Sequence, residues 1–207
     1  MKKIKNPKNA RRYIYPMRTY LLSTRNKNNK SNLITLDWVM PVSINPPLLG
    51  ASIGVNRFSE QILKSSEDFV ISVPTKNMLE DVWFAGTKSG RNLDKFQETD
   101  LTKIESKMVN SYSVEEAVAN IECEIREKKR FGDHFLYVGE IVGGTYNDDF
   151  FDNERPLMDL ESGLLMHLNS NKFLEENIED FNHSPIYYRQ LFLRLVELDE
   201  YSKCKQL

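Results

Sequence analysis

A loop of residues 86–96 combines the groups that proteins use to hold a phosphate. It reads GTKSGRNLDKF, with two hydroxyl side chains, two glycines and three cations in eleven residues. Backbone N–H groups freed by glycine can surround phosphate oxygens, while lysine and arginine offset their charge. The GxxxxGK[ST] spacing of a Walker loop is absent, which disfavours hydrolysis of a magnesium nucleotide. The residues alone also allow an exposed loop with ordinary surface charges.

A second stretch, residues 31–53, reads SNLITLDWVMPVSINPPLLGASI and places polar side chains among apolar ones. These polar residues are Asn32, Thr35, Asp37, Ser43 and Ser52. A strand that only contributed to a hydrophobic core would not need so many polar side chains. Small residues around position 50 would let a flat ligand or another backbone come close. We interpret this stretch as the floor of a ligand site.

Short strands must position both stretches. Composition and alternation predict strands at residues 17–24, 33–40, 48–55, 69–73, 117–129, 134–143 and 164–168. The polar run 25–30 predicts a hairpin turn, and Gly132 with Asp133 predicts another. The prolines at positions 41, 46 and 47 should interrupt continuous strand pairing.

Three helices are expected. The first spans 59–65 with Ser59 as its cap, and the second spans 77–85 with Asn77 and Glu80 as a capping box and Gly86 as a stop. The third begins at Ser184 and Pro185. Its apolar stripe is Tyr188, Leu191, Phe192, Leu195 and Leu198. Because no βαβ alternation is sustained, a mainly β barrel with helical insertions fits better than a doubly wound sheet.

Composition narrows the function classes. The 207 residues carry a net charge of −2, which gives no overall bias toward nucleic acid or an anionic membrane. No apolar run reaches the ~18 residues that a membrane span needs. Two distant cysteines, Cys123 and Cys204, form neither a disulfide framework nor a zinc pattern, so we expect a cytoplasmic protein. His167 and His183 stand apart from any ligand cluster, and no metal site is expected.

Five motifs in order resemble the flavin reductase-like family, also called the flavoredoxin or FMN-binding split-barrel family. They are N-x-x-T-x-x-W-x-x-P-V-S-x-x-P-P at 32–47, R-F-S at 57–59, F-V-I-S-V-P at 69–74, S-G-R-x-x-D-K-F at 89–96 and G-D-H-x-x-x-V-G-E at 132–140. With the strand before them they cover residues 17–143, about two thirds of the chain. The pattern departs from the family after about Gly144, and the final helix has no counterpart in it.

The resemblance implies an FMN-binding split β-barrel, a Greek-key-like antiparallel barrel with short helical insertions, here followed by a C-terminal helix. It implies a homodimer with FMN near the subunit interface, and NADH or NADPH as electron donor. We expect a basic tail over residues 1–16, the flavin domain over 17–170 and a helical extension over 171–207. Neither nucleic acid nor a membrane is an expected partner.

The resemblance also assigns roles to residues. Lys95 is the first choice for the phosphate, then Arg91 and Arg57, with Ser89 and Gly90 as hydrogen-bond donors. The ring edge would meet the backbone around Thr35 to Trp38 and Ser52. The full expected cofactor set is Asn32, Leu33, Ile34, Thr35, Leu36, Asp37, Trp38, Ser52, Ile53, Arg57, Ser89, Gly90, Arg91 and Lys95. His134 is the expected catalytic residue, beside the nicotinamide or the flavin edge.

Plainer roles remain open for the same residues. Trp38 would serve equally as core, Asn32 as a turn residue, Arg57 as a surface cation and His134 as a loop hydrogen bond. Three functions also stay open. They are an NAD(P)H-dependent flavin reductase passing electrons to flavin, a ferric complex or another acceptor; an FMN-carrying electron-transfer protein; and a split barrel that has lost flavin.

Overall fold

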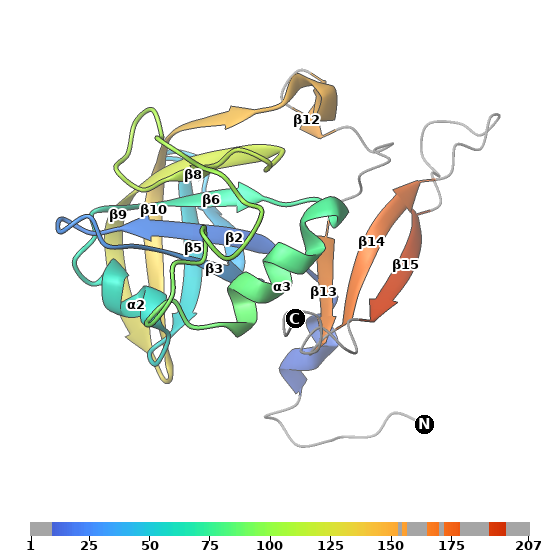
Figure 1. The fold of residues 1–207 in the computed structure, drawn as a ribbon, viewed down its shortest axis with the longest axis horizontal. Coiled ribbons are helices and arrows are strands. Elements are labelled where there is room, and N and C mark those ends of the chain that lie inside the picture. The colour runs from blue at the N-terminus through green and yellow to red at the C-terminus, as the bar shows by residue number, and fades with distance from the viewer. Residues whose placement is uncertain (1–9, 153–154, 157–164, 170–171, 179–190, 198–207) are drawn as a thin grey trace.

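The computed structural model describes residues 10–152, 155–156, 165–169, 172–178 and 191–197 (Figure 1). Its strands are β1 (Met17–Arg18), β2 (Tyr20–Arg25), β3 (Ser31–Leu36), β4 (Val39–Ser43), β5 (Leu48–Gly54), β6 (Asp68–Val73), β7 (Lys103–Ile104), β8 (Ser113–Val114), β9 (Ala119–Phe131), β10 (His134–Tyr146), β11 (Phe151–Asp152), β12 (Arg155–Pro156), β13 (Leu165–Asn169), β14 (Lys172–Ile178) and β15 (Leu191–Glu197). The helices are α2 (Phe58–Leu63) and α3 (Leu79–Thr87), with 3-10 turns η1 (Arg11–Ile14), η2 (Lys76–Met78) and η3 (Asp148–Phe150).

Seven antiparallel strands form the main sheet in the order β3-β2-β6-β9-β10-β5-β4. A separate sheet joins β1 to β13, β14 and β15, and lies to the side of the main sheet in Figure 1. The expectation of a mainly β, antiparallel fold with few helices is confirmed. Each of the seven predicted strand regions contains a strand.

Turn chemistry explains two hairpins of the sheet, β2–β3 at one edge and β9–β10 near the middle. In the β2–β3 turn, the side chain of Asn26 accepts hydrogen bonds from the backbone N–H groups of Asn28 and Lys30, and Asn29 has a φ of 60°. In the β9–β10 turn, Gly132 also has a φ of 60°, where glycine carries no steric cost. Both turns were predicted from sequence, and both are confirmed.

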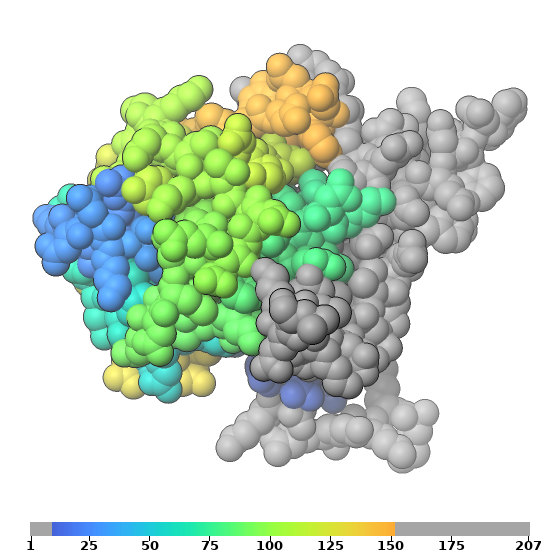
Figure 2. Space-filling model, viewed as in Figure 1, coloured from blue at the N-terminus to red at the C-terminus, as the bar shows by residue number. Residues whose placement is uncertain are grey.

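The main sheet is covered on both faces, because alternate side chains of β2 and β3 are apolar on each side. Leu21 and Leu33 pack on one face against α3 and against Phe96 in the segment that follows it. Leu22 and Ile34 point to the other face, into a core that includes Tyr137. Figure 2 shows the segment between α3 and β8, in green, covering the first of these faces. The segment containing the predicted phosphate loop is therefore packed onto the barrel.

The second core encloses Cys123, which was expected to be an inert core thiol. Its side chain is fully buried, and burial raises the pKa of the thiol to about 12. Cys204 lies outside the described residues. Among the helices that the structure describes, none is both long and apolar enough to cross a membrane.

The prolines act at the edge of the sheet. Strand β4 is an edge strand and pairs with β5 through Pro41, with a register shift between Pro41 and Ser43. An edge strand tolerates proline, since its missing N–H need not meet a neighbour. Pairing is interrupted as expected, although the strand continues past Pro41.

Three helix predictions need correction. Helix α2 starts at Phe58 with Arg57 as its N-cap, so Ser59 does not cap it and is buried instead. No side chain caps η2 or α3, so the expected Asn77–Glu80 capping box is not formed, and α3 runs through Gly86 to Thr87. Tertiary packing decides these helix ends more than local capping preferences do.

The C-terminal helix prediction is also wrong where the structure describes the chain. Residues 191–197 form strand β15, which pairs antiparallel with β14, while the expected helix start at Ser184 lies outside the described residues. The segment LFLRLVE alternates leucine with other residues, so it satisfies a period of two as well as a helical stripe. Pairing with a neighbouring strand decided between the two patterns.

We predict that Gly139→Ala destabilises the barrel by about 1–3 kcal/mol through overpacking. A Cβ at this position would lie 2.8 Å from the Cβ of Cys123 and 2.8 Å from the ring of Phe69, both fully buried. Urea unfolding measures the change. The matched control is Gly54→Ala in β5, where the nearest atom is 3.6 Å away, and we expect its stability to stay within about 1 kcal/mol of wild type. Equal effects at both glycines would contradict the packing described here.

Candidate functional site

Two adjoining cavities lie where β3, β5 and the C-terminal end of α3 meet. The broad cavity has a volume of about 420 Å³ and the narrow cavity about 140 Å³. The two share Ile34, Arg57, Gly86 and Thr87 in their walls. A ligand with a wide part and a compact end could therefore occupy both at once.

Six of the 14 residues that line the broad cavity come from the predicted floor, residues 31–53. Its lining is Tyr15, Ile34, Thr35, Leu36, Asp37, Trp38, Ser52, Gly54, Arg57, Val82, Trp83, Gly86, Thr87 and His134. Two tryptophans offer flat apolar surface, while Thr35 and Ser52 offer hydroxyls. Its volume lies in the range of cavities that bind drug-sized molecules.

An aromatic wall closes one side of the broad cavity. The rings of Trp38 and His134 lie 4.7 Å apart, centroid to centroid, at an interplanar angle of 31°. The indole Nε1–H of Trp38 donates to the hydroxyl of Tyr15 at 3.4 Å. Tyr15 belongs to the region predicted as a basic tail, so this part of that region contributes to the site. The wall joins three separate segments of the chain.

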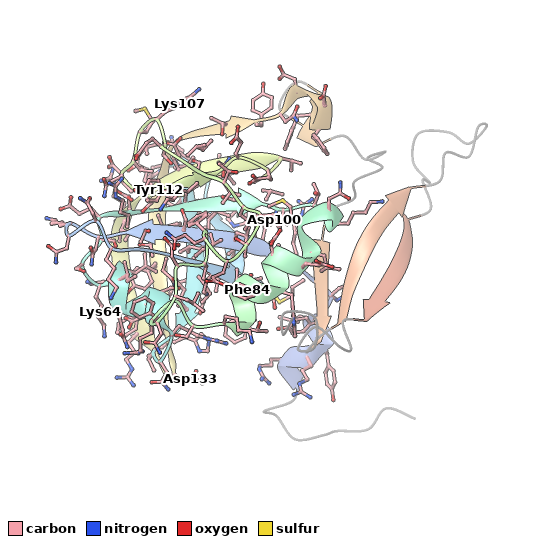
Figure 3. The ribbon with its side chains drawn as sticks, in the orientation of Figure 1. Lys64, Phe84, Asp100, Lys107, Tyr112 and Asp133 are labelled. Carbon is pink, nitrogen blue, oxygen red and sulfur yellow. The ribbon has the colours of Figure 1, made fainter. Side chains whose placement is uncertain are left out.

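Asp133 orients the imidazole of that wall. Nδ1–H of His134 donates to Oδ1 of Asp133 at 2.7 Å, and this hydrogen bond lowers the pKa of the Asp133 carboxyl. Figure 3 labels Asp133 at the turn end of the β9–β10 hairpin. Nε2 of His134 lies 3.7 Å from the position that a Cβ on Gly54 would take. The second ring nitrogen is thus directed along the cavity wall, away from the carboxylate.

Helix α3 forms the opposite wall and is fixed to β3. Oγ1 of Thr35 donates to the carbonyl of Val82 at 2.5 Å. A Cβ on Gly86 would approach the Cβ of Thr35 to 3.1 Å, so glycine permits the close contact between helix and strand. This contact brings Thr35 and Gly86 together in the wall of the broad cavity, and Gly86 also lines the narrow one.

The narrow cavity is positively charged. Arg57, Lys88 and Lys95 line it together with the hydroxyl residues Ser59 and Ser89, and its described lining contains no acidic residue. Arginine and lysine with neighbouring hydroxyls are the groups that bind phosphate oxygens. The composition of this cavity thus favours an anionic group at the compact end of a ligand.

Lys95 lies at the base of the narrow cavity and is 4% exposed. Its Nζ donates to the carbonyl of Leu33 at 2.7 Å and to the carbonyl of Ala85 at 2.5 Å. Burial, and to a smaller extent the charge of Arg57, lowers the pKa of the ammonium to about 8. The ammonium also offsets the negative end of the α3 dipole. Lys95 therefore joins strand and helix, and an ammonium has one further N–H to offer a ligand.

Asn32 and Gly90 form the tightest contact of the narrow cavity. The buried amide of Asn32 donates through Nδ2 to Oγ of Ser59 at 2.6 Å. A Cβ on Gly90 would lie 1.9 Å from Oδ1 of Asn32, so only glycine fits there. Asn32 thus lies between the predicted phosphate loop and α2 and contacts both. This is more than the role of a turn residue, which the sequence also allowed.

Arg91 lies outside this lining. Its guanidinium carbon is 5.6 Å from the ring centroid of Phe58, and Nζ of Lys30 is 4.8 Å from the same centroid. Phe58 itself lines the narrow cavity. Both cations therefore lie at the mouth of the cavity rather than within it.

The structure brings most of the predicted site residues together. Those in the walls of one or both cavities are Asn32, Ile34, Thr35, Leu36, Asp37, Trp38, Ser52, Arg57, Ser89, Gly90, Lys95 and His134. Leu33 and Ile53 are fully buried in the cores behind the floor, and Arg91 is at the mouth. Sequence reasoning missed Tyr15, Gly54, Val82 and Trp83 in the broad cavity, and Asn56 and Phe58 in the narrow one.

A third cavity of about 630 Å³ lies elsewhere on the barrel, between the ends of β9 and β10 and the turn η3. Tyr20, Tyr146 and Phe150 are among its walls, and Arg18 is the one charged residue of its described lining. It lacks the cation set of the narrow cavity. Across the described residues, no group of three or more histidine, cysteine, aspartate or glutamate side chains could hold a metal ion.

We predict that Gly90→Ala displaces Asn32 and lowers stability by about 1–3 kcal/mol, because the added methyl cannot coexist with the buried amide. Thermal unfolding measures the loss. The double variant Asn32→Ala/Gly90→Ala relieves the overlap, so it should be less destabilised than the sum of the two single variants. Simple additivity would count against the close contact.

Residues 11–170 match the family model described as flavin reductase like domain. An uncharacterized protein of Archaeoglobus fulgidus is 40% identical over 169 residues, covering 82% of this chain and 93% of that protein.

Two solved structures have the same fold. The FMN-binding protein from Thermus thermophilus, with bound 1-cyclohex-2-enone, is 26% identical and has a TM-score of 0.76 over 88% of this chain and 99% of that one. Flavoredoxin from Methanosarcina acetivorans is 23% identical and has a TM-score of 0.72 over 90% and 97% of the two chains. These matches confirm the FMN-binding split-barrel fold class. The chain belongs to the flavin reductase-like family.

Proposed function

We propose that the protein is an FMN-binding oxidoreductase of the flavin reductase type, with a nicotinamide nucleotide as electron donor. One observation carries the proposal. A broad cavity with an aromatic wall adjoins a narrow cavity lined by cations, and the two share lining residues. FMN has the same division into a wide ring system and a single phosphate. Membership of the family supports the redox part of the proposal.

The chemistry of the cavity residues fits FMN. We place the ring system in the broad cavity, against the backbone and side chains of Thr35, Trp38 and Ser52. The phosphate would meet Lys95, Lys88 and Arg57 in the narrow cavity, whose volume of about 140 Å³ suits a compact monophosphate. The FMN-binding protein from Thermus thermophilus, 26% identical, supports FMN over FAD.

The residues of the chain would orient the reactants rather than form covalent intermediates. A bound flavin would supply the hydride-accepting ring, and the nicotinamide nucleotide the hydride. Tryptophan and histidine rings of the aromatic wall would exclude water from one side of the site. His134, held through Nδ1 by Asp133, would hold or deliver a proton at Nε2.

We further propose a cytoplasmic homodimer. The exposed side chains of Met40, Val42 and Ile44, which are 54%, 45% and 95% exposed, form an apolar stripe along the edge strand β4 and the turn after it. No charged residue occurs from residue 38 to residue 56, so such a stripe can face its own copy without charge repulsion. The cytoplasmic location is supported by family membership and by the low cysteine content.

A visible spectrum and anaerobic mixing test the function. We expect the purified or FMN-reconstituted protein to be yellow and to bleach rapidly with NADH or NADPH. If the protein binds flavin but neither nucleotide bleaches it, the proposed function changes from a reductase to an electron carrier. Failure to bind any flavin would reject both functions.

We predict that Lys95→Met weakens FMN binding by about 10-fold or more, because a charge-assisted hydrogen bond contributes about 1.5–3 kcal/mol. Riboflavin has no phosphate, so its affinity should fall less. Fluorescence titration of both flavins measures the difference. Equal losses for FMN and riboflavin would assign Lys95 a purely structural role.

The same lysine predicts a pH dependence. Between about pH 7 and its pKa of about 8 the ammonium is charged and the phosphate is mostly a dianion, so the ratio of FMN to riboflavin affinity should be highest there. The ratio should fall as the pH rises above about 8, because the neutral amine no longer offsets the phosphate charge. Lys95→Met should show no such fall. A flat ratio for wild type up to pH 10 would contradict the assignment.

We predict that His134→Gln slows reduction of the bound flavin by NAD(P)H on the order of 100-fold, the usual effect of losing a proton-transfer group. Affinity for FMN should change little, since His134 is not in the lining of the narrow cavity, where the phosphate would bind. Stopped-flow reduction measures the rate. Asp133→Asn keeps a hydrogen-bond acceptor and should give an intermediate rate. If His134→Gln is reduced at the wild-type rate, His134 has no role in proton transfer.

A further inference from the structure

Lys30 and Arg91 are two exposed cations beside the proposed flavin site. They come from different segments, the β2–β3 turn and the loop after α3, yet both lie over the ring of Phe58. Neither lines the broad or the narrow cavity, whereas Phe58 lines the narrow one. The geometry therefore holds two positive charges just outside the place proposed for the phosphate.

Phe58 gives these long side chains a fixed position. The ring is half-buried at the start of α2, next to the buried Ser59 that binds Asn32. A cation near an aromatic ring is attracted to its face. Among the ion pairs of the described residues, none involves Lys30 or Arg91. Their charges are thus positioned by a ring and are available to an anion.

The charge of the narrow cavity is already balanced without them. A phosphate monoester carries a charge of about −1.5 to −2 at neutral pH. Arg57, Lys88 and Lys95 supply up to three positive charges within the cavity. Lys30 and Arg91 add two more that the single phosphate of FMN does not require.

The opposite side of the site is less suited to an anion. Asp37 lines the broad cavity, and Asp133 adjoins its aromatic wall through His134. Arg57 is the one lysine or arginine of the described lining there, and it is shared with the narrow cavity, so the broad cavity offers no further such cation to the phosphates of a nucleotide whose nicotinamide lies in it. The charged half of such a nucleotide would therefore extend toward the mouth of the narrow cavity.

We propose that Lys30, Phe58 and Arg91 form a second phosphoryl-binding subsite, which takes the phosphates of the pyridine-nucleotide donor. The inference rests on the proposed function and names the part of the surface that would hold the donor. The phosphoryl group has two possible sources, the diphosphate common to NADH and NADPH and the 2′-phosphate of NADPH alone. Phe58 positions the cations, and the cations contact the phosphoryl oxygens.

The test compares Lys30→Gln/Arg91→Gln with a matched control, Lys27→Gln. Lys27 belongs to the same turn as Lys30, but its ammonium is paired with Glu67 at 2.7 Å. We measure KM and kcat for NADH and NADPH with the FMN-loaded protein, and Kd for FMN by fluorescence. The double variant should raise KM about 10-fold while kcat and the Kd for FMN stay within about twofold. Lys27→Gln should match wild type.

The two donors distinguish the source of the phosphoryl group. A rise in KM for both nucleotides assigns the subsite to the diphosphate, and a rise for NADPH alone assigns it to the 2′-phosphate. Added salt should raise KM in wild type and have less effect in the double variant.

The outcomes that overturn the subsite differ from those that overturn the function. Unchanged KM values in a folded, FMN-loaded double variant reject the subsite and leave the reductase intact. A parallel loss of FMN affinity also rejects it, by assigning both cations to the flavin phosphate. If wild type binds FMN but neither nucleotide reduces it, the proposed donor fails and the subsite fails with it.

Discussion

The buried ammonium of Lys95 is the contact on which the site depends. It joins the carbonyl of Leu33 in β3 to the carbonyl of Ala85 near the end of α3. Without hydrogen bonds, a buried charge would destabilise the fold by several kcal/mol, so the two carbonyl acceptors make its position possible. The ammonium then serves two purposes, because it holds helix to strand and places a positive charge at the base of the narrow cavity.

Other constraints follow from that contact. Once α3 is held against β3, Gly86 packs closely on Thr35, and Gly90 must lie on Asn32 without a side chain. The narrow cavity and the broad cavity then result from one arrangement of strand, helix and loop. The partly exposed wall of Trp38, His134 and Tyr15 completes the broad end. Binding and redox roles can thus be divided between the narrow and the broad cavity.

Much of this arrangement could be predicted from the sequence. Alternation and turn residues identified the hairpins. Of the five polar residues noted in 31–53, Thr35, Asp37 and Ser52 line the broad cavity, Asn32 lines the narrow one and Ser43 lines neither. Trp83 and Tyr15 could not be found this way, because a tryptophan in a helix and a tyrosine in a basic segment have no local mark of a ligand site. The burial of Lys95 was also invisible, since it depends on two carbonyls distant in sequence. Residues 191–197 satisfied two periodicities, and only strand pairing decided between them.

The most direct test of the central claim is a crystal structure of the protein with FMN. We expect the phosphate in the narrow cavity, within hydrogen-bond distance of Nζ of Lys95, and the ring system in the broad cavity beside Trp38. A flavin bound instead in the 630 Å³ cavity near Tyr146, or with its phosphate in solvent far from Lys95, would contradict the claim.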